Sequence, residues 1–282
     1  MSMIKKTTLA LAISAIAGGA LAQSAPAPAP APAPATSPIT ANVTVTNDYR
    51  YRGISQSNFQ PAIQGGFDYA HESGFYIGNW NSSISWITDQ WGPANNGPIK
   101  SAPIEMDFYA GFKKELIAPG FATDIGVLQY YYPITGVINT ASFKNFNTTE
   151  IYAAQNFTAG PVAGFLKFSY AATTLFGFYG STGSTYTDLT LNYDTGIWGI
   201  TANAHVGYQY FAGTSATAGV SNSSLYTYTD WKLGLTKDFG GGLSLSAAYV
   251  DTNAKKANYT YSNTSSKSLG GSGAVVALTK TF

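Results

Sequence analysis

Residues 228–239 read Tyr-Thr-Asp-Trp-Lys-Leu-Gly-Leu-Thr-Lys-Asp-Phe and show the pattern that decides the fold. Successive side chains of a β-strand point to opposite sides. One face of this segment therefore carries the apolar Trp231 and Leu233, and the opposite face carries the charged Asp230 and Lys232. Such a strand suits a wall between lipid and water, but a soluble β-sandwich has the same period, so the alternation alone leaves both classes open.

The same alternation recurs in segments of roughly ten residues along the rest of the chain. It predicts an all-β fold with about twelve antiparallel strands connected up and down. The predicted strands are residues 42–51, 60–70, 74–86, 103–115, 121–132, 148–158, 162–172, 184–194, 197–210, 226–238, 242–251 and 270–282. Tight connections such as 195–196 alternate with long polar ones such as 212–225, and an even strand number puts both termini on the side of the tight turns.

The beginning of the chain decides between the two classes. Lys5 and Lys6 precede an apolar run at 9–17, and Ala22 closes a small-residue cleavage site. We therefore predict that residues 1–22 are a secretory signal peptide. The apolar run is shorter than the about 20 residues that a spanning helix needs, so an exported chain of this kind would cross a bilayer as a barrel. We predict an integral protein of the outer membrane.

Composition agrees with a barrel in a membrane. Charged residues make up 10% of the chain and aromatic residues 15%, whereas about 25% of the residues in soluble domains are charged. Tyrosine and tryptophan favour the boundary between hydrocarbon and water. The net charge of +1 gives no reason to expect nucleic acid, and the absence of cysteine with only 2 histidines argues against a metal site or a cofactor.

Residues 23–40 are predicted to be an Ala/Pro-rich linker on the periplasmic side, and residues 41–282 the barrel. The strict Ala-Pro alternation at 25–35 cannot pack a core and favours an extended polyproline II conformation. A solvated spacer is the simpler interpretation, and an arm that reaches the cell wall or a partner is the alternative.

Four stretches resemble a known family. They are residues 47–57 (Asn-Asp-Tyr-Arg-Tyr-Arg-Gly-Ile-Ser-Gln-Ser), the alternation of Gly74, Tyr76, Gly78 and Trp80, the strand with Glu105, Asp107, Tyr109 and Gly111, and residues 130–133 (Tyr-Tyr-Tyr-Pro). Together they resemble the TorF porin family, with Asn47 where that family is expected to have serine. The resemblance implies an outer-membrane location and a pore, and it implies no particular substrate.

The predicted lumen is lined by those faces of the strands that lie opposite the large apolar residues. A lysine or arginine that faces lipid at mid-depth costs about 2 to 4 kcal/mol, so the charges should point inward. Asn79 and Asn81 are assigned to the same inward face. The predicted pore-lining residues are Asp48, Arg50, Arg52, Asp68, Glu105, Asp107, Asp124, Glu150, Lys167, Asp188, His205, Asp230 and Lys232.

Carboxylates outnumber bases in this set, which favours a channel with a mild preference for cations. A barrel of about twelve strands leaves an estimated bore of about 10 to 12 Å, so ions and small solutes would pass by diffusion. The alternative is that acids and bases pair across the lumen and plug it, leaving a structural barrel that acts as an adhesin or receptor through its surface loops.

No catalytic residue is predicted. His71 falls in a tight turn and His205 on an inward face, and neither has a serine that the pattern places beside it. The expected partners are outer-membrane lipid, periplasmic chaperones, the barrel assembly machinery, and ions or small solutes. Phe282 ends an alternating strand and is the predicted assembly signal.

The linker prediction can be tested by deletion. Removing residues 25–35 while keeping the signal peptide should leave the yield and thermal midpoint of the folded barrel unchanged, because an extended segment buries no apolar surface. Heat-modifiable migration in gels measures both quantities. A large loss of either would show that the segment packs against the barrel.

Overall fold

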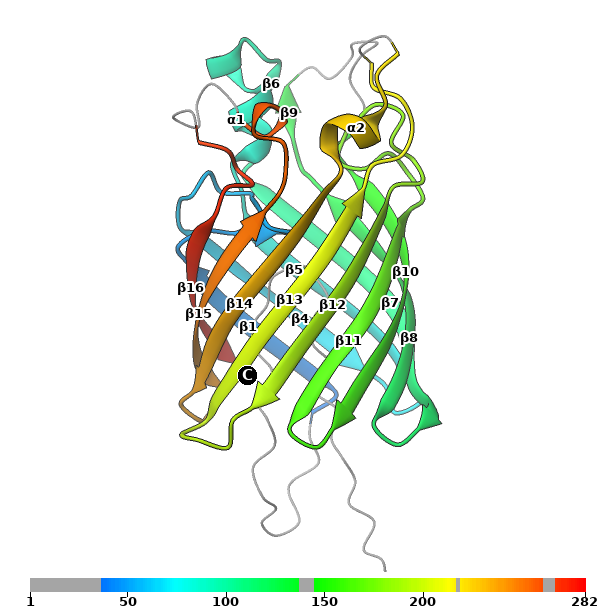
Figure 1. The fold of residues 1–282 in the computed structure, drawn as a ribbon, viewed down its shortest axis with the longest axis vertical. Helices are drawn as coiled ribbons and strands as arrows, with labels where there is room; N and C mark the ends of the chain where they lie inside the picture. Colours follow the sequence, from blue (N-terminus) through cyan, green and yellow to red (C-terminus); the bar gives the residue numbers. More distant parts are fainter. Residues whose placement is uncertain (1–36, 137–144, 217–218, 261–266) are drawn as a thin grey trace, which may run out of the picture.

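The computed structural model describes residues 37–136, 145–216, 219–260 and 267–282. The predicted signal peptide and most of the predicted linker lie outside these residues. Twelve strands form a closed barrel in which every neighbouring pair is antiparallel, in the order β1-β16-β15-β14-β13-β12-β11-β10-β8-β7-β5-β4 (Figure 1). The prediction of a twelve-stranded antiparallel barrel is confirmed. In the described part of the chain, no helix combines the length and apolar character needed to span a bilayer.

The barrel strands have the following bounds: β1 (Ile39–Thr46), β4 (Ala62–Ala70), β5 (Phe75–Ser83), β7 (Ile104–Ala118), β8 (Phe121–Tyr131), β10 (Thr148–Ala159), β11 (Val162–Ala171), β12 (Thr185–Asp194), β13 (Ile200–Tyr210), β14 (Tyr228–Asp238), β15 (Leu243–Thr252) and β16 (Gly273–Thr281). The first and last strands close the ring, with Thr44 opposite Thr279 and their hydroxyl oxygens 2.8 Å apart. Closure pairs both edges of each of the twelve barrel strands.

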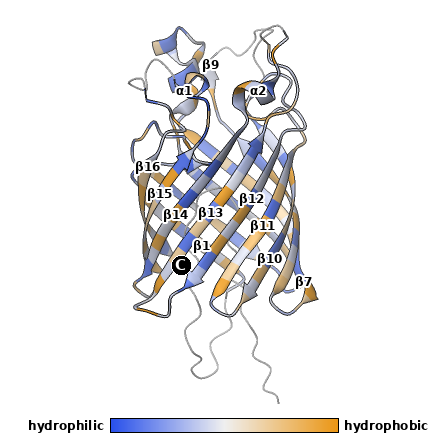
Figure 2. Cartoon of the chain, in the orientation of Figure 1, coloured by the Kyte–Doolittle hydropathy of each residue, from blue (hydrophilic) through white to orange (hydrophobic). Residues whose placement is uncertain are grey.

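Apolar side chains cover the outside of the barrel. Leu233 and Leu235 of β14 are 58% and 55% exposed, while Asp230 on the opposite face is 1% exposed. Figure 2 shows hydrophobic and hydrophilic residues alternating along the strands. The face assignment made from residues 228–239 is therefore correct, because the period of two separates an outer apolar face from an inner polar one.

The connections differ at the two ends of the barrel. Tight turns join the strands at one end, which we call the turn end. Longer connections at the opposite, loop end carry α1 (Trp86–Trp91), β6 (Ile99–Ser101), β9 (Thr135–Gly136) and α2 (Asn222–Tyr226) (Figure 1). The connections between barrel strands also contain β2 (Arg50–Tyr51), β3 (Ile54–Ser55), η1 (Pro93–Asn95) and η2 (Lys256–Asn258).

The first strand is shorter than predicted. It ends at Thr46 instead of continuing to residue 51. Residues 47–59 leave the wall and form a small hairpin around β2 and β3, which we call the lumen hairpin. Asp48, Arg50 and Arg52 were assigned to the strand, and that assignment is wrong: the side chains are buried, but they lie on the hairpin.

The faces of β5 are also the reverse of the prediction. Asn79 lies beside Phe67 and Phe108 on the outer face, and its amide donates to the backbone oxygen of Asp107. Tyr76 and Trp80 are each 2% exposed and point inward. The small amide of Asn79 can lie on the outer face because its nitrogen is hydrogen-bonded to the backbone. The aromatic rings of Tyr76 and Trp80 fill the interior instead.

Inward tyrosines lie across glycines of the adjacent strands. Tyr76 of β5 is opposite Gly111 of β7, and Tyr109 of β7 is opposite Gly78 of β5. A Cβ added at Gly111 would collide with the Tyr76 ring and would lie 2.6 Å from the oxygen of Ile125. The alternation of glycine and tyrosine in the sequence thus places a glycine, which has no side chain, beneath each of these tyrosine rings. The rings can therefore lie flat against the inner wall.

Replacing Gly111→Val should destabilise the barrel by about 1 to 3 kcal/mol, because the added methyl groups overlap the Tyr76 ring and the neighbouring backbone. The thermal midpoint of heat-modifiable migration measures the loss. Ala153→Val, which adds volume on the exposed outer face of β10, is the matched control and should leave the midpoint near that of the wild type. Equal midpoints for both variants would contradict the ring-on-glycine packing.

Candidate functional site

The lumen hairpin is built on a two-residue turn. Arg50 pairs with Ser55 and Tyr51 pairs with Ile54, so Arg52 and Gly53 are the two turn residues. Both have positive φ, 47° and 78°, as a tight turn of the primed type requires. A side chain at Gly53 would overlap Asp230 of β14 and Thr252 of β15. Glycine therefore lets the tip of the hairpin lie directly against the barrel wall.

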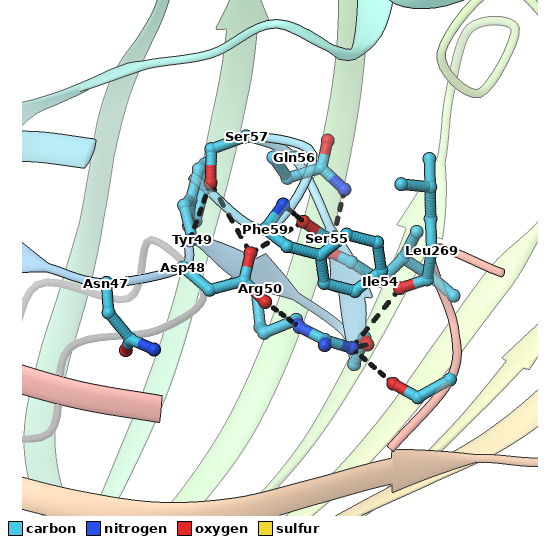
Figure 3. Close-up of polar contacts among 12 residues, drawn as sticks. Asn47, Asp48, Tyr49, Arg50, Ile54, Ser55, Gln56, Ser57, Phe59 and Leu269 are labelled. Carbon is cyan, nitrogen blue, oxygen red and sulfur yellow. Dashed lines mark hydrogen bonds and ion pairs between the residues drawn. The ribbon is translucent and has the colours of Figure 1, made fainter. Parts of the chain in front are cut away.

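Ionic contacts fix the base of the hairpin (Figure 3). The Nε of Arg50 lies 2.5 Å from a carboxylate oxygen of Asp48, and the other carboxylate oxygen accepts a hydrogen bond from Ser55 at 2.6 Å. The guanidinium also donates to the backbone oxygens of Leu269 at 3.2 Å and Gly271 at 2.8 Å, in the connection that precedes β16. The base is thus bonded both to itself and to the connection that precedes β16.

The tip of the hairpin crosses the barrel. Arg52 donates to Glu150 of β10 at 2.7 Å and to Gln209 of β13 at 2.6 Å. Its guanidinium lies 4.2 Å from the ring centroid of Tyr186 on β12. In the ring of strands, β10 to β13 lie opposite β1, from which the hairpin starts. The hairpin therefore spans the barrel interior near the loop end.

Tyrosine hydroxyls attach the hairpin to a third side of the wall. Tyr49 donates to one carboxylate oxygen of Glu105 on β7 at 2.5 Å, and Tyr132 donates to the other at 2.5 Å. The Tyr49 ring packs edge-on against Trp80 of β5, with centroids 5.5 Å apart. Burial raises the pKa of Tyr49 well above its ordinary value, and the neighbouring Glu105 raises it further. Tyr49 therefore keeps its proton and acts as a donor.

The charged side chains below and around the hairpin are distributed unevenly. On the β4 to β8 wall, Asp68 accepts from Tyr109 at 2.6 Å and Asp124 accepts from Tyr76 at 2.6 Å. Neither carboxylate oxygen of Asp107 has a hydrogen-bond partner among the described residues. This wall consequently carries acids that are bonded to neutral tyrosines or left without a hydrogen bond.

The opposite wall holds most of the bases. His205 of β13 lies between two acids, with Nδ1 2.9 Å from Asp188 and Nε2 2.8 Å from Asp230. Lys232 of β14 is directly opposite His205 in the register, and Lys167 of β11 is opposite Asp188. Two carboxylates around one imidazole favour its charged form, which donates from both nitrogens.

The structure places all thirteen predicted residues inside the barrel. Ten of them are buried, and Asp188, His205 and Lys232 are partly buried. The acids and bases meet in three ion-paired groups: Asp48 with Arg50, Arg52 with Glu150, and His205 with Asp188 and Asp230. Whether these residues line an open pore stays a prediction.

Sequence reasoning missed the tyrosines and the inner Gln209. Tyr49 and Tyr186 bond to buried acids, and Tyr76 and Tyr109 do the same one layer deeper. The signal that could have found them is the alternation of Gly and Tyr on neighbouring strands. In the described ranges, no group of three or more His, Cys, Asp or Glu side chains is placed to hold a metal ion.

The closed, charge-lined barrel has the porin type of fold. The NanC porin is similar, with a TM-score of 0.52 and 9% identity over 86% of this chain and 98% of that chain. A KdgM porin has a TM-score of 0.49 and 6% identity over 86% of this chain and 98% of that one. At these identities the likeness concerns the fold alone.

Residues 30–282 match the model of a family described as "Bacterial protein of unknown function (Gcw_chp)". The chain therefore belongs to the Gcw_chp family. No curated protein matches the chain. The matched family model is not named TorF, so the resemblance to the TorF family stays a prediction.

Breaking the Arg52–Glu150 ion pair should loosen the hairpin. Glu150→Gln leaves Arg52 buried without its charge partner, and loss of one partner of a buried pair costs about 3 to 5 kcal/mol. The chain has no cysteine, so Ile54→Cys, at a site 8% exposed, provides a unique thiol on the hairpin. We expect maleimide to label this thiol at least several-fold faster in the Glu150→Gln background.

Glu115→Gln, which neutralises an exposed carboxylate near the turn end, is the matched control and should leave the labelling rate unchanged. Heat-modifiable migration shows that each variant still forms a barrel. Equal labelling in all three backgrounds would mean that Arg52 and Glu150 do not hold the hairpin.

Proposed function

We propose that this protein is an outer-membrane channel for passive diffusion of ions or small solutes, narrow and mildly cation-preferring, and held closed at its loop end by the lumen hairpin. One observation carries the proposal: the interior of the barrel contains a separate segment whose attachments to the wall include buried ion pairs and hydrogen bonds. Contacts of this kind can exchange with water, whereas an apolar core would exclude it.

The outer surface supports a membrane location. Apolar side chains on the strands remain exposed, which a soluble protein of this size would bury. Phe282 is 72% exposed at the end of the chain, where the assembly machinery could contact it. Together with the predicted signal peptide, these features favour export and insertion as a barrel.

The charge distribution supports a preference for cations. The thirteen predicted inward residues comprise eight carboxylates and five bases. On the β4 to β8 wall, Asp68 and Asp124 accept hydrogen bonds from tyrosines, and Lys113 of β7, opposite Asp124 in the register, offsets part of the negative charge. A cation that passes the hairpin would travel along this wall.

The second candidate is a plugged barrel that works through its loop end as an adhesin or receptor. The observation that favours it is the attachment of the hairpin to several sides of the wall at once. Electrical conductance separates the two functions. The protein in a planar bilayer should show small, intermittent openings if it is a channel, and no openings if the hairpin is permanent. A channel also predicts that Glu150→Gln opens more often.

Neutralising the acidic wall should reduce the cation preference. In the double variant Glu105→Gln, Asp107→Asn, the reversal potential across a salt gradient should move toward zero, because two inward carboxylates lose their charge. The preference of the wild type should also fade with salt, since the Debye length falls from about 10 Å at 0.1 M to about 3 Å at 1 M.

The matched control is Glu72→Gln, Glu115→Gln, which removes the same charge near the turn end and should leave the reversal potential unchanged. Anion selectivity of the wild type would contradict the proposed preference, and so would an unchanged potential in the Glu105 and Asp107 variant. Absence of conductance in the wild type and in Glu150→Gln would favour the plugged barrel.

A further inference from the structure

The lumen hairpin forms one side of a pocket at the loop end. The pocket has a volume of about 70 Å³ and is lined by Tyr51 and Ile54 of the hairpin, by Trp86 of α1 and by aromatic side chains of the neighbouring connections. On this scale one water molecule needs about 10 to 15 Å³, and a cavity of about 150 Å³ takes one benzene ring. The pocket therefore has room for a few water molecules or a small ion, and it is too small for a ring compound.

The lining of the pocket is polar in places but uncharged. Among the described residues that line it, none carries a charge, and the polar groups are amides, hydroxyls and one indole. Groups of this kind can replace part of the hydration of a small ion without holding the ion tightly, as a conducting path requires. The lining therefore suits an entry chamber better than a site of tight binding.

The inner end of the pocket touches the tip of the hairpin. Tyr51 and Gln209 line the pocket and also contact Arg52. The guanidinium of Arg52 lies 4.8 Å from the ring centroid of Tyr51 and donates to Oε1 of Gln209 at 2.6 Å. Arg52 in turn donates to Glu150 at 2.7 Å. At this point one layer of side chains separates the pocket from the ion pairs of the interior.

The two side chains of that layer are held in different ways. The Tyr51 ring packs edge-on against Tyr130 with centroids 5.6 Å apart, and the two hydroxyl oxygens are 2.7 Å apart. Gln209 is held by hydrogen bonds, and its amide nitrogen donates to the backbone oxygens of Thr185 at 3.1 Å and Tyr210 at 3.2 Å. The hydrogen bonds of an amide can exchange with water, whereas packed rings must first separate. Gln209 is therefore the side chain of the layer that yields more readily.

The groups beneath Gln209 belong to the charged wall. Two residues deeper on the inward face of β13 lies Gly207, where an added Cβ would be 2.7 Å from a carboxylate oxygen of Asp230. The same acid lies 2.8 Å from Nε2 of His205, the next inward residue of this strand. An ion that passes Gln209 would therefore come close to the carboxylate of Asp230.

We infer that this pocket is the outer vestibule of the conduction path and that Gln209 closes its inner end through its contact with Arg52. The inference rests on the proposed channel and narrows its solutes to water and small inorganic ions, because the vestibule has no room for a larger solute. Movement of Gln209 leaves the ion pair between Arg52 and Glu150 in place. This path is therefore distinct from release of the whole hairpin.

Gln209→Ala removes the amide that contacts Arg52. In a planar bilayer with potassium chloride, the variant should raise the open fraction about tenfold over the wild type, because one hydrogen bond to a charged group is lost. Gln129→Ala is the matched control. Gln129 lies on the outer face of β8 and also donates to backbone oxygens, those of Tyr130 at 2.7 Å and Thr148 at 3.2 Å. Its removal should leave the open fraction unchanged.

The size of the permeant cation separates the vestibule path from release of the hairpin. Potassium ions and the bulky N-methylglucammonium ion are placed on opposite sides of the bilayer, and the reversal potential gives their permeability ratio. Gln209→Ala should favour potassium at least about tenfold more strongly than Glu150→Gln does, because only the latter loosens the hairpin and widens the opening. A merely structural role of Gln209 would give both variants the same ratio.

Heat-modifiable migration shows whether each variant forms a barrel, and Gln209→Asn, which shortens the side chain but keeps the amide, replaces Gln209→Ala if that variant does not fold. Its open fraction should rise in the same direction. If Glu150→Gln conducts, equal open fractions in the Gln209 and Gln129 variants would overturn the inference, and so would equal permeability ratios in the Gln209 and Glu150 variants. Absence of conductance in every variant would contradict the channel itself, so the two failures are distinguishable.

Discussion

A hydrocarbon environment offers no hydrogen-bond partner to a peptide group, and this constraint governs the fold. The twelve strands satisfy it by closing into a ring in which β1 pairs with β16. Closure then fixes where the charges go. An outward charge would meet lipid, so the ionisable side chains of the strands gather in the enclosed space, where their own desolvation must be compensated.

The interior meets that requirement by pairing and by tyrosine hydroxyls. Arg52 crosses the barrel to Glu150, and His205 lies between two carboxylates. Tyr76 and Tyr109 donate to acids that form no ion pair with a base in the part of the chain that the structure describes. Glycines on adjacent strands let these rings lie flat against the wall. The sequence motifs of the strands thus serve one purpose, which is to solvate buried charge with protein groups.

The lumen hairpin links this network to the loop end. Arg52 and Tyr49 bond to acids of the wall, whereas Tyr51 and Ile54 line a pocket together with aromatic side chains of the loop-end connections. A change in either set of contacts would alter the free energy that keeps the hairpin inside. The hairpin therefore connects the charged interior of the barrel with the aromatic loop end.

The sequence by itself determined the class of fold, the number of strands, the apolar outer face seen at Leu233 and Leu235, and the inward position of acids such as Glu105 and Asp107. These follow from the period of two, which is a local property. Only the tertiary structure decided that residues 47–59 leave β1 and that Trp80 points inward. The alternation of Tyr49 and Tyr51 with Asp48, Arg50 and Arg52 is equally typical of a strand. Both faces of that segment are buried only because the closed ring encloses a volume lined with aromatic and ionic partners on opposite sides, and those partners are distant in sequence.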